Sequence, residues 1–153
     1  MFNLTDKTAL ITGGSRGIGA ATALALAMQG ADVAFSYQSN EAAADEVVAS
    51  VEKLGRRAFA FAADARDGEA LKELWKGSET ALGKIDILVN NAGIVKTSFL
   101  AMTGDASWDE TFDVNLKAAF RLSKLAAKSM NRRKWGRIIN VSSQAAQMGD
   151  VMR

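Results

Sequence analysis

Five short apolar runs alternate with longer amphipathic stretches, and this alternation is the strongest constraint on the fold. The runs lie at 8–12, 32–37, 57–63, 86–91 and 137–143. They are nearly continuous in apolar residues, which is typical of strands that are covered on both faces. Apolar residues recur at helical spacing in the intervening stretches 17–29, 41–54, 67–82 and 107–131. The order predicts an α/β protein with a doubly wound parallel sheet.

Composition excludes several classes of protein. The 153 residues suffice for one domain, and 48% hydrophobic with 24% charged residues is typical of a soluble globular chain. A net charge of +2 gives no indication of nucleic acid or membrane binding. The absence of cysteine and histidine excludes a disulfide framework, an imidazole base and cysteine or histidine metal ligands, so we expect no metal site. With no apolar run of bilayer length and no signal-like start, we expect a cytoplasmic protein.

The segment "TGGSRGIG" at 12–19 lies where the first predicted strand meets the first helix. It is either a plain tight turn or a seat for a phosphate, because helix N-termini present free amides and partial positive charge. In the second interpretation Gly13 permits the sharp turn and Gly17 lets the backbone approach a pyrophosphate. Gly19 then lets the helix lie close to the sheet, and Gly14 has no assigned role.

Three further motifs follow in order: "NNAG" at 90–93, "VN" at 114–115 and "INVSS" at 139–143. Together with the glycine segment they resemble the short-chain dehydrogenase/reductase family. The resemblance is strongest to its 3-oxoacyl-(acyl-carrier-protein) and acetoacetyl-CoA reductases, and the first of these groups implies a role in fatty acid biosynthesis. It implies a Rossmann-type fold with strand order 3-2-1-4-5. We therefore expect residues 1–153 to form a single NADP-binding domain that lacks the family's C-terminal strands.

The resemblance also implies which residues contact the cofactor. They are Gly13, Ser15, Arg16, Gly17, Ile18, Gly19, Tyr37, Ser39, Asp64, Asn91, Ala92 and Gly93. Asp64 resembles the family's contact to the adenine amino group, although it would equally serve as a cap for the following helix. Asn90 and its neighbours are expected to brace the sheet. The alternative for "NNAG" is a turn in left-handed backbone.

The end of the second strand indicates which nicotinamide cofactor is used. A free ribose 2′-hydroxyl is typically bound by a carboxylate there, whereas a 2′-phosphate is repelled by one. The segment "SYQSN" at 36–40 has no acid before Glu41, and Arg16 is expected nearby. NADP(H) is therefore favoured. Tyr37 and Ser39 are candidate neighbours of the phosphate, although an ordinary solvated turn would explain them equally well.

The catalytic candidates are Asn115 and Ser143, which match the family's asparagine and serine. A polar helix residue and a strand-end hydroxyl are the alternatives. The family's acid is the tyrosine of a Tyr-x-x-x-Lys motif, but the only tyrosine in this sequence is Tyr37 and the motif is absent. One expectation is the N-terminal part of an NADP(H)-dependent reductase of small carbonyl substrates, such as thioesters of acyl carrier protein or CoA. The other is a truncated module that binds NADP(H) without catalysis or pairs through its open strand edge.

Two surface features predict partners. Apolar residues cover more of the predicted helix 107–131 than one sheet can bury, and the resemblance implies a homo-oligomer, either a dimer or a tetramer. The helix end carries the basic residues Lys128, Arg132, Arg133, Lys134 and Arg137. These form either a solvated helix end or a docking site for an acidic carrier protein.

Overall fold

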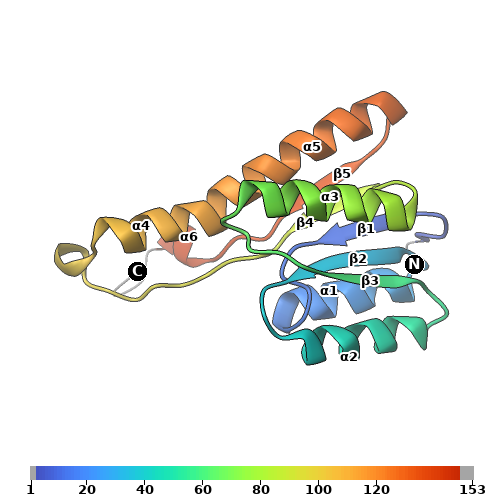
Figure 1. Cartoon of the computed structure of the whole chain (residues 1–153), viewed down its shortest axis with the longest axis horizontal. Helices are drawn as coiled ribbons and strands as arrows, with labels where there is room; N and C mark the ends of the chain where they lie inside the picture. The colour runs from blue at the N-terminus through green and yellow to red at the C-terminus, as the bar shows by residue number, and fades with distance from the viewer. Residues whose placement is uncertain (1–2, 149–153) are drawn as a thin grey trace.

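The structure, a computed structural model, describes residues 3–148 and contains a five-stranded parallel sheet between two layers of helices (Figure 1). The strands are β1 (Thr8–Ile11), β2 (Asp32–Tyr37), β3 (Ala58–Ala62), β4 (Ile87–Asn90) and β5 (Arg137–Asn140). Their order is β3-β2-β1-β4-β5, and every neighbouring pair is parallel. The predicted doubly wound sheet and its strand order are confirmed.

Both faces of the sheet are buried at β1, β2 and β4, which explains the continuous apolar sequences of these strands. Helices α1 (Gly17–Met28) and α2 (Glu41–Glu52) cover one face, and α3 (Gly68–Leu82) and α5 (Ala118–Arg133) cover the other (Figure 1). Successive strand residues therefore enter different cores: Ile11 and Phe35 pack in the cluster with α1 and α2, whereas Leu10 packs in the cluster with α3 and α5. No helix in this described range is long and apolar enough to cross a membrane.

The single helix predicted over 107–131 is wrong in detail. The chain first forms a short 3-10 turn, η1 (Leu100–Met102), and then the helix α4 (Asp105–Phe112). A π-helical turn, η2 (Asp113–Lys117), separates α4 from α5 and is held by an ion pair from Lys117 Nζ to Asp113 Oδ1 at 2.8 Å. A π turn widens the helix and changes which side its residues face. Asn115 lies within this widened turn.

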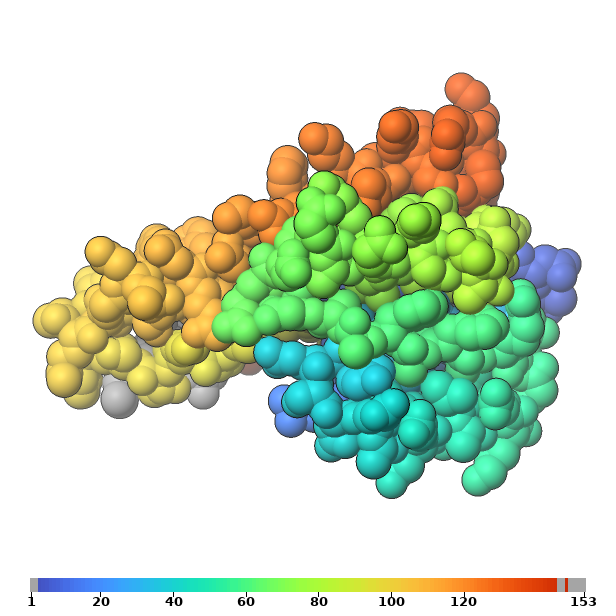
Figure 2. Space-filling view, in the orientation of Figure 1, coloured from blue at the N-terminus to red at the C-terminus, as the bar shows by residue number. Residues whose placement is uncertain are grey.

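Helix α4 and the loop before it protrude beyond the sheet as an arm (Figure 2). An apolar stripe of Trp108, Phe112, Leu116 and Phe120 runs from α4 through η2 into α5, and these side chains are 42–64% exposed. The Trp108 and Phe112 rings lie 4.4 Å apart. The other side of α5 is buried through Leu122 and Met130. The sequence therefore correctly indicated more apolar surface than the sheet covers.

β5 is an outer strand of the described sheet. It ends at Asn140 rather than at the predicted 143, and the short helix α6 (Ala145–Met148) follows the loop. Ile138 and Ile139 are 38% and 47% exposed. Strand β5 thus combines an apolar sequence with an accessible surface, as expected from the sequence.

Ion pairs lie at the amino ends of the strands, which we call the amino edge of the sheet. Asp32 contacts Arg56 Nη2 at 2.6 Å and Arg57 Nε at 2.8 Å. The buried carboxylate of Asp86 lies 3.0 Å from Lys84 Nζ and 3.6 Å from Arg133 Nη2. These charges are paired within the chain, so this edge contributes to stability.

The predicted basic cluster is divided by the structure. Arg133 turns inward, donating to Ser129 Oγ at 2.7 Å and to the Ile85 carbonyl. Arg137 lies over the Trp135 ring, 5.2 Å from its centroid. Only Lys128, Arg132 and Lys134 remain as exposed helix-end cations without such contacts in the described part of the chain.

Candidate functional site

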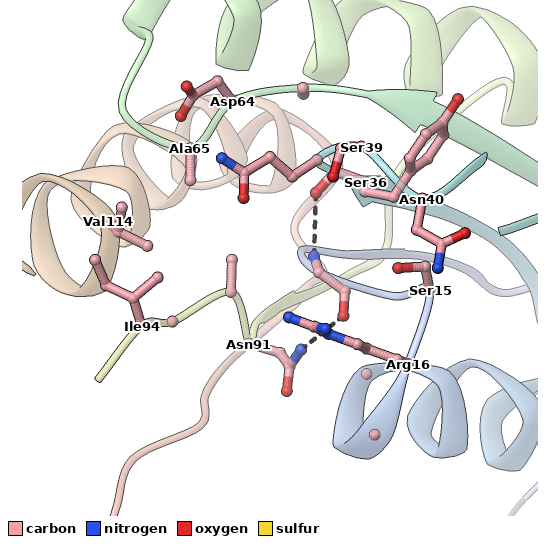
Figure 3. A pocket seen from close by; sticks show the side chains of 18 of the residues that line it. Ser15, Arg16, Ser36, Ser39, Asn40, Asp64, Ala65, Asn91, Ile94 and Val114 are labelled. Carbon is pink, nitrogen blue, oxygen red and sulfur yellow. Dashed lines mark hydrogen bonds between the residues drawn. The ribbon is translucent and has the colours of Figure 1, made fainter. Parts of the chain in front are cut away.

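A cavity of about 430 Å³ opens at the carboxyl ends of the strands, between the loops that follow β1, β2, β3 and β4 (Figure 3). Its lining includes every residue that the sequence assigned to the cofactor: Gly13, Ser15, Arg16, Gly17, Ile18, Gly19, Tyr37, Ser39, Asp64, Asn91, Ala92 and Gly93. Figure 3 shows Ser15, Arg16 and Asn40 at one end and Ala65, Ile94 and Val114 at the other. The fold thus gathers residues from four separate segments around one hollow.

Helix α1 begins at this cavity without a side-chain cap. Its N-cap residue Arg16 is extended, with φ −157° and ψ 168°, and makes no capping hydrogen bond, and the first turn contains no acidic residue. The first backbone N–H groups of an α-helix have no partner within the helix, and they carry partial positive charge. Because Gly17, Ile18 and Gly19 line the cavity, these amides are placed to bind an anion there.

Three positions of the first loop require glycine, each for a different structural reason. Gly13 has φ 67°, as the expected sharp turn requires, and its N–H donates to Ser36 Oγ at 3.1 Å. A Cβ atom on Gly19 would overlap the Gly13 carbonyl oxygen, so the close approach is to the turn rather than to a strand. Gly14, which the sequence left unexplained, is required because a Cβ atom there would overlap the Phe35 side chain.

The "NNAG" segment braces the ends of β1 and β4. Thr12 Oγ1 accepts from the N–H groups of Asn91 and Ala92, each at 2.9 Å. Asn91 Nδ2 donates to the carbonyls of Thr12 and Gly13 at 2.8 and 3.1 Å. Asn90 Nδ2 donates to Asn140 Oδ1 at 2.8 Å and so connects β4 with β5. In the described chain the positive φ angles occur at other residues, so the left-handed turn considered for this motif is wrong.

Asp64 is held by Arg66 rather than by the following helix. Asp64 Oδ1 accepts from the Arg66 N–H at 2.9 Å, and Arg66 Nη2 contacts Oδ2 at 2.6 Å. Hydrogen bonds from the Arg66 side chain and backbone lower the pKa of Asp64 below its ordinary value, despite some burial. The residue that caps α3 is Asp67, whose carboxylate accepts from the Glu69 N–H at 2.8 Å. The alternative role for Asp64 as a helix cap is therefore wrong.

The two catalytic candidates occupy different surroundings. Asn115 lines a second cavity of about 380 Å³ together with Ser142. Its amide is engaged on the chain itself, because Oδ1 accepts from the Ile94 N–H at 2.8 Å and Nδ2 donates to the Ile94 carbonyl at 2.9 Å. Ser143 follows β5, and its Oγ accepts from the Ala145 N–H at 3.2 Å at the start of α6. Within the described residues Ser143 does not line either of these two cavities.

Sequence reasoning missed several lining residues. Ile94 directly follows "NNAG" and Val114 is the valine of the "VN" motif, which was quoted without a role for this residue, and both form the apolar end of the cavity. Arg66 and Glu110 also line the cavity, but they are charged surface residues of different segments. Nothing in their spacing indicates that they meet.

Comparisons with known proteins agree with this geometry. The family model for short chain dehydrogenases matches residues 7–153. A 3-oxoacyl-(acyl-carrier-protein) reductase from Synechocystis is 41% identical over 150 residues, which is 98% of this chain and 61% of the relative. FabG, the enzyme of the same name from Staphylococcus epidermidis, is 39% identical over 145 residues, covering 95% of this chain and 59% of its own.

Among solved structures, a short chain dehydrogenase from Burkholderia cenocepacia in complex with NADP superposes with a TM-score of 0.91 at 41% identity. The match covers 98% of this chain and 60% of that one. This chain therefore spans about 60% of the length of the relatives it matches. Fold, motif positions and similarity agree, and the chain belongs to the short-chain dehydrogenase/reductase family.

Proposed function

We propose that the cavity binds NADP(H) and that the protein reduces a 3-oxoacyl thioester or a similar ketone. The uncapped start of α1 carries this proposal, because it presents free amides to the cavity at Gly17, where a Cβ atom would meet only open space. The residues present fit the dinucleotide: a donor-rich helix start for the diphosphate, and Ala65, Ile94 and Val114 for a flat apolar base. The Burkholderia relative, in complex with NADP, supports the same cofactor class.

NADP(H) rather than NAD(H) is supported by the charge at the other end of the cavity. Ser15, Arg16, Ser39 and Asn40 offer a guanidinium and small polar groups there. The acidic lining residues, Asp64 and Glu110, are joined by Arg66 away from that end. We expect Ser39→Asp to lower the NADPH:NADH affinity ratio about tenfold, because the new carboxylate repels a 2′-phosphate and accepts from a 2′-hydroxyl. Ser39→Asn is the uncharged control, and an unchanged ratio in Ser39→Asp contradicts this assignment.

When bound, the reduced nicotinamide supplies the hydride. This chain's own groups would then bind the dinucleotide, keep the loop after β4 in place through Asn115, and offer the Ser143 hydroxyl as a donor to the substrate carbonyl. Protonation of the resulting alkoxide requires an acid, and the resemblance assigns it to a Tyr-x-x-x-Lys pair. Residues 1–153 contain no such pair. The second candidate function is therefore NADP(H) binding without turnover.

Two partner surfaces belong to the proposal. The apolar stripe of Trp108, Phe112, Leu116 and Phe120 is proposed to pack against a second copy of the chain. The exposed cations Lys128 and Arg132 are the candidates for contact with an acidic acyl carrier. Arg133 is unsuitable for testing that contact, because its guanidinium is bound to Ser129 and Asp86.

The experiment that tests the function combines a binding titration with a turnover assay. NADPH fluorescence is titrated with the purified protein, and oxidation of NADPH is followed with acetoacetyl-CoA and with an acyl-carrier-linked 3-oxoacyl substrate. Saturable binding with turnover supports the reductase. Saturable binding with neither substrate turned over supports the binding module, and absence of NADPH binding contradicts both.

A further inference from the structure

Four charged side chains at the apolar end of the cavity are joined in series by ion pairs. They are Asp64, Arg66, Glu110 and Lys96. Arg66 Nε lies 3.0 Å from both carboxylate oxygens of Asp64, and Arg66 Nη1 lies 3.2 Å from Glu110 Oε1. Glu110 is in turn ion-paired with Lys96. The four residues come from the loop after β3, from α4 and from the loop after β4. They connect the protruding arm to the loop after β3.

The loop that carries Asp64 and Arg66 is also held from α5. Arg121 Nη1 donates to the Arg66 carbonyl at 3.1 Å, and its guanidinium carbon lies 3.1 Å from the position that a Cβ atom on Gly68 would take. The Arg66 guanidinium is thus attached to the carboxylates of Asp64 and Glu110, and its backbone is attached to Arg121. This restricts the directions in which the Asp64 carboxylate can point.

The carboxylates of Asp64 and Glu110 are both ionised near neutral pH. Hydrogen bonds from Arg66 lower the pKa of Asp64, and the hydrogen bond from Lys96 lowers that of Glu110. An ionised carboxylate only accepts hydrogen bonds, with about two sites on each oxygen. The backbone N–H of Arg66 bonds to Oδ1 of Asp64 and Nη2 bonds to Oδ2, while the single Nε–H is shared between the two oxygens, so three donors meet about four acceptor sites. Acceptor capacity therefore remains on Asp64 for one further donor from the cavity.

We propose that Arg66, anchored by Glu110, is a positioning residue that directs the Asp64 carboxylate toward the exocyclic amino group of adenine. This inference rests on the proposed binding of NADP(H). Asp64 lines the cavity beside Ala65, at the end where Ile94 and Val114 offer apolar contact to a base. A base with a carbonyl in place of the amino group would oppose one acceptor to another. The arrangement therefore selects adenine over hypoxanthine.

The test compares NADPH with reduced nicotinamide hypoxanthine dinucleotide phosphate, whose base has a carbonyl in place of the amino group and a proton on the adjacent ring nitrogen. Their dissociation constants are measured by fluorescence titration for the unmodified protein and for Arg66→Ala, Arg66→Lys and Glu110→Gln. Lys72→Ala is the matched control, because it removes an exposed ion pair, to Glu69 at 2.6 Å, that lies outside the cavity lining.

We expect the unmodified protein and Lys72→Ala to prefer NADPH about tenfold, as one well-formed charged hydrogen bond implies. Arg66→Ala should bring the two constants within about twofold by weakening NADPH alone. Glu110→Gln and Arg66→Lys should retain an intermediate preference, since Lys provides no planar fork.

Four results overturn the inference. An unmodified protein that binds both dinucleotides equally contradicts it while leaving the proposed function intact. Equal weakening of both dinucleotides in Arg66→Ala and Glu110→Gln assigns Arg66 a structural role only, and unchanged preference in both variants assigns it none. An unmodified protein that binds neither dinucleotide overturns the proposed function together with the inference.

Discussion

The two ends of the parallel strands differ in how their charged and polar groups are paired. At the amino edge the buried Asp32 and Asp86 are each satisfied by cations and backbone donors of the chain itself. At the carboxyl edge α1 starts on a cavity with neither a cap nor an acidic residue. The buried carboxylates are paired at one edge, whereas the first amides of α1 are left without partners at the other, so we assign stability to the first edge and binding to the second.

The helix starts sharpen this contrast, because α1, α2 and α3 all begin at the carboxyl edge. Asn40 caps α2 by accepting from the Ala43 N–H at 3.0 Å, and Asp67 caps α3. Each of these helices also has a glutamate in its first turn. Only α1 among the three lacks both features. The missing cap is therefore specific to the helix that begins at the cavity and is not a general feature of the helices at this edge.

The largest expected effect comes from a side chain at Gly19, where helix α1 packs directly against the Gly13 turn. Gly19→Val should weaken NADPH binding at least 100-fold, about 2.7 kcal/mol, because the side chain overlaps the Gly13 carbonyl and displaces the loop. Fluorescence titration gives the affinity, and circular dichroism verifies the fold. Gly104→Val, at the start of α4 with open space around it, is the control. Comparable affinity in the two variants would break the assignment of binding to this loop.

At the amino edge we expect Asp32→Asn to destabilise the protein by about 2 kcal/mol at pH 7 without changing NADPH affinity. Burial raises the pKa of Asp32, but hydrogen bonds from Arg57 and the charges of Arg56 and Arg57 outweigh it, so the net pKa is lowered. The ionised form is thus favoured by folding.

The stabilisation from Asp32 is therefore complete above its unfolded pKa of about 3.9 and is lost as the pH falls through the lower folded value. Urea denaturation should show the difference between the two proteins narrowing below about pH 4. A difference that is unchanged down to pH 2, or a loss of NADPH affinity in Asp32→Asn, would contradict the separation of the two edges.

A matched pair at Ile18 isolates charge from shape. Ile18→Glu should bind NADPH about tenfold more weakly than Ile18→Gln, since the carboxylate competes for the helix amides and repels the diphosphate. The ratio should shrink with added salt, because the residue is 64% exposed. Calorimetric titration at two ionic strengths measures it. Equal affinities at low salt would mean that the α1 start makes no electrostatic contribution.

The smallest expected effect concerns a capped helix start. Asp67→Ala should lower the free energy of unfolding by about 1 kcal/mol, the usual value for a lost N-cap, while NADPH affinity stays within about twofold. Asp67→Asn, which keeps an accepting oxygen, should retain most of the stability. A loss of NADPH affinity in Asp67→Ala as large as the difference between Ile18→Glu and Ile18→Gln would contradict the distinction between capped and uncapped helix starts.

The strands were predictable, because β1 (Thr8–Ile11) sends alternate residues into two different cores and therefore has a continuous apolar sequence. Their order was predicted from the resemblance to the family and not from the apolar runs. The cavity lining was predictable where it lies within contiguous motifs. The π turn at 113–117 was not, since Trp108, Phe112, Leu116 and Phe120 keep a spacing of four straight through it. The meeting of Arg66 with Glu110 was also unpredictable, because the residues are 44 positions apart and only the fold brings them together.

The most direct test of the central assignment is the amide spectrum of the ¹⁵N-labelled protein during titration with NADP⁺. We expect large, saturable shifts for the amides of Gly17, Ile18 and Gly19, with Thr8 and Arg57 at the amino edge nearly unchanged. If the three α1 amides stay in place at saturating NADP⁺, or if the shifts gather at the amino edge instead, the uncapped helix start does not hold the dinucleotide.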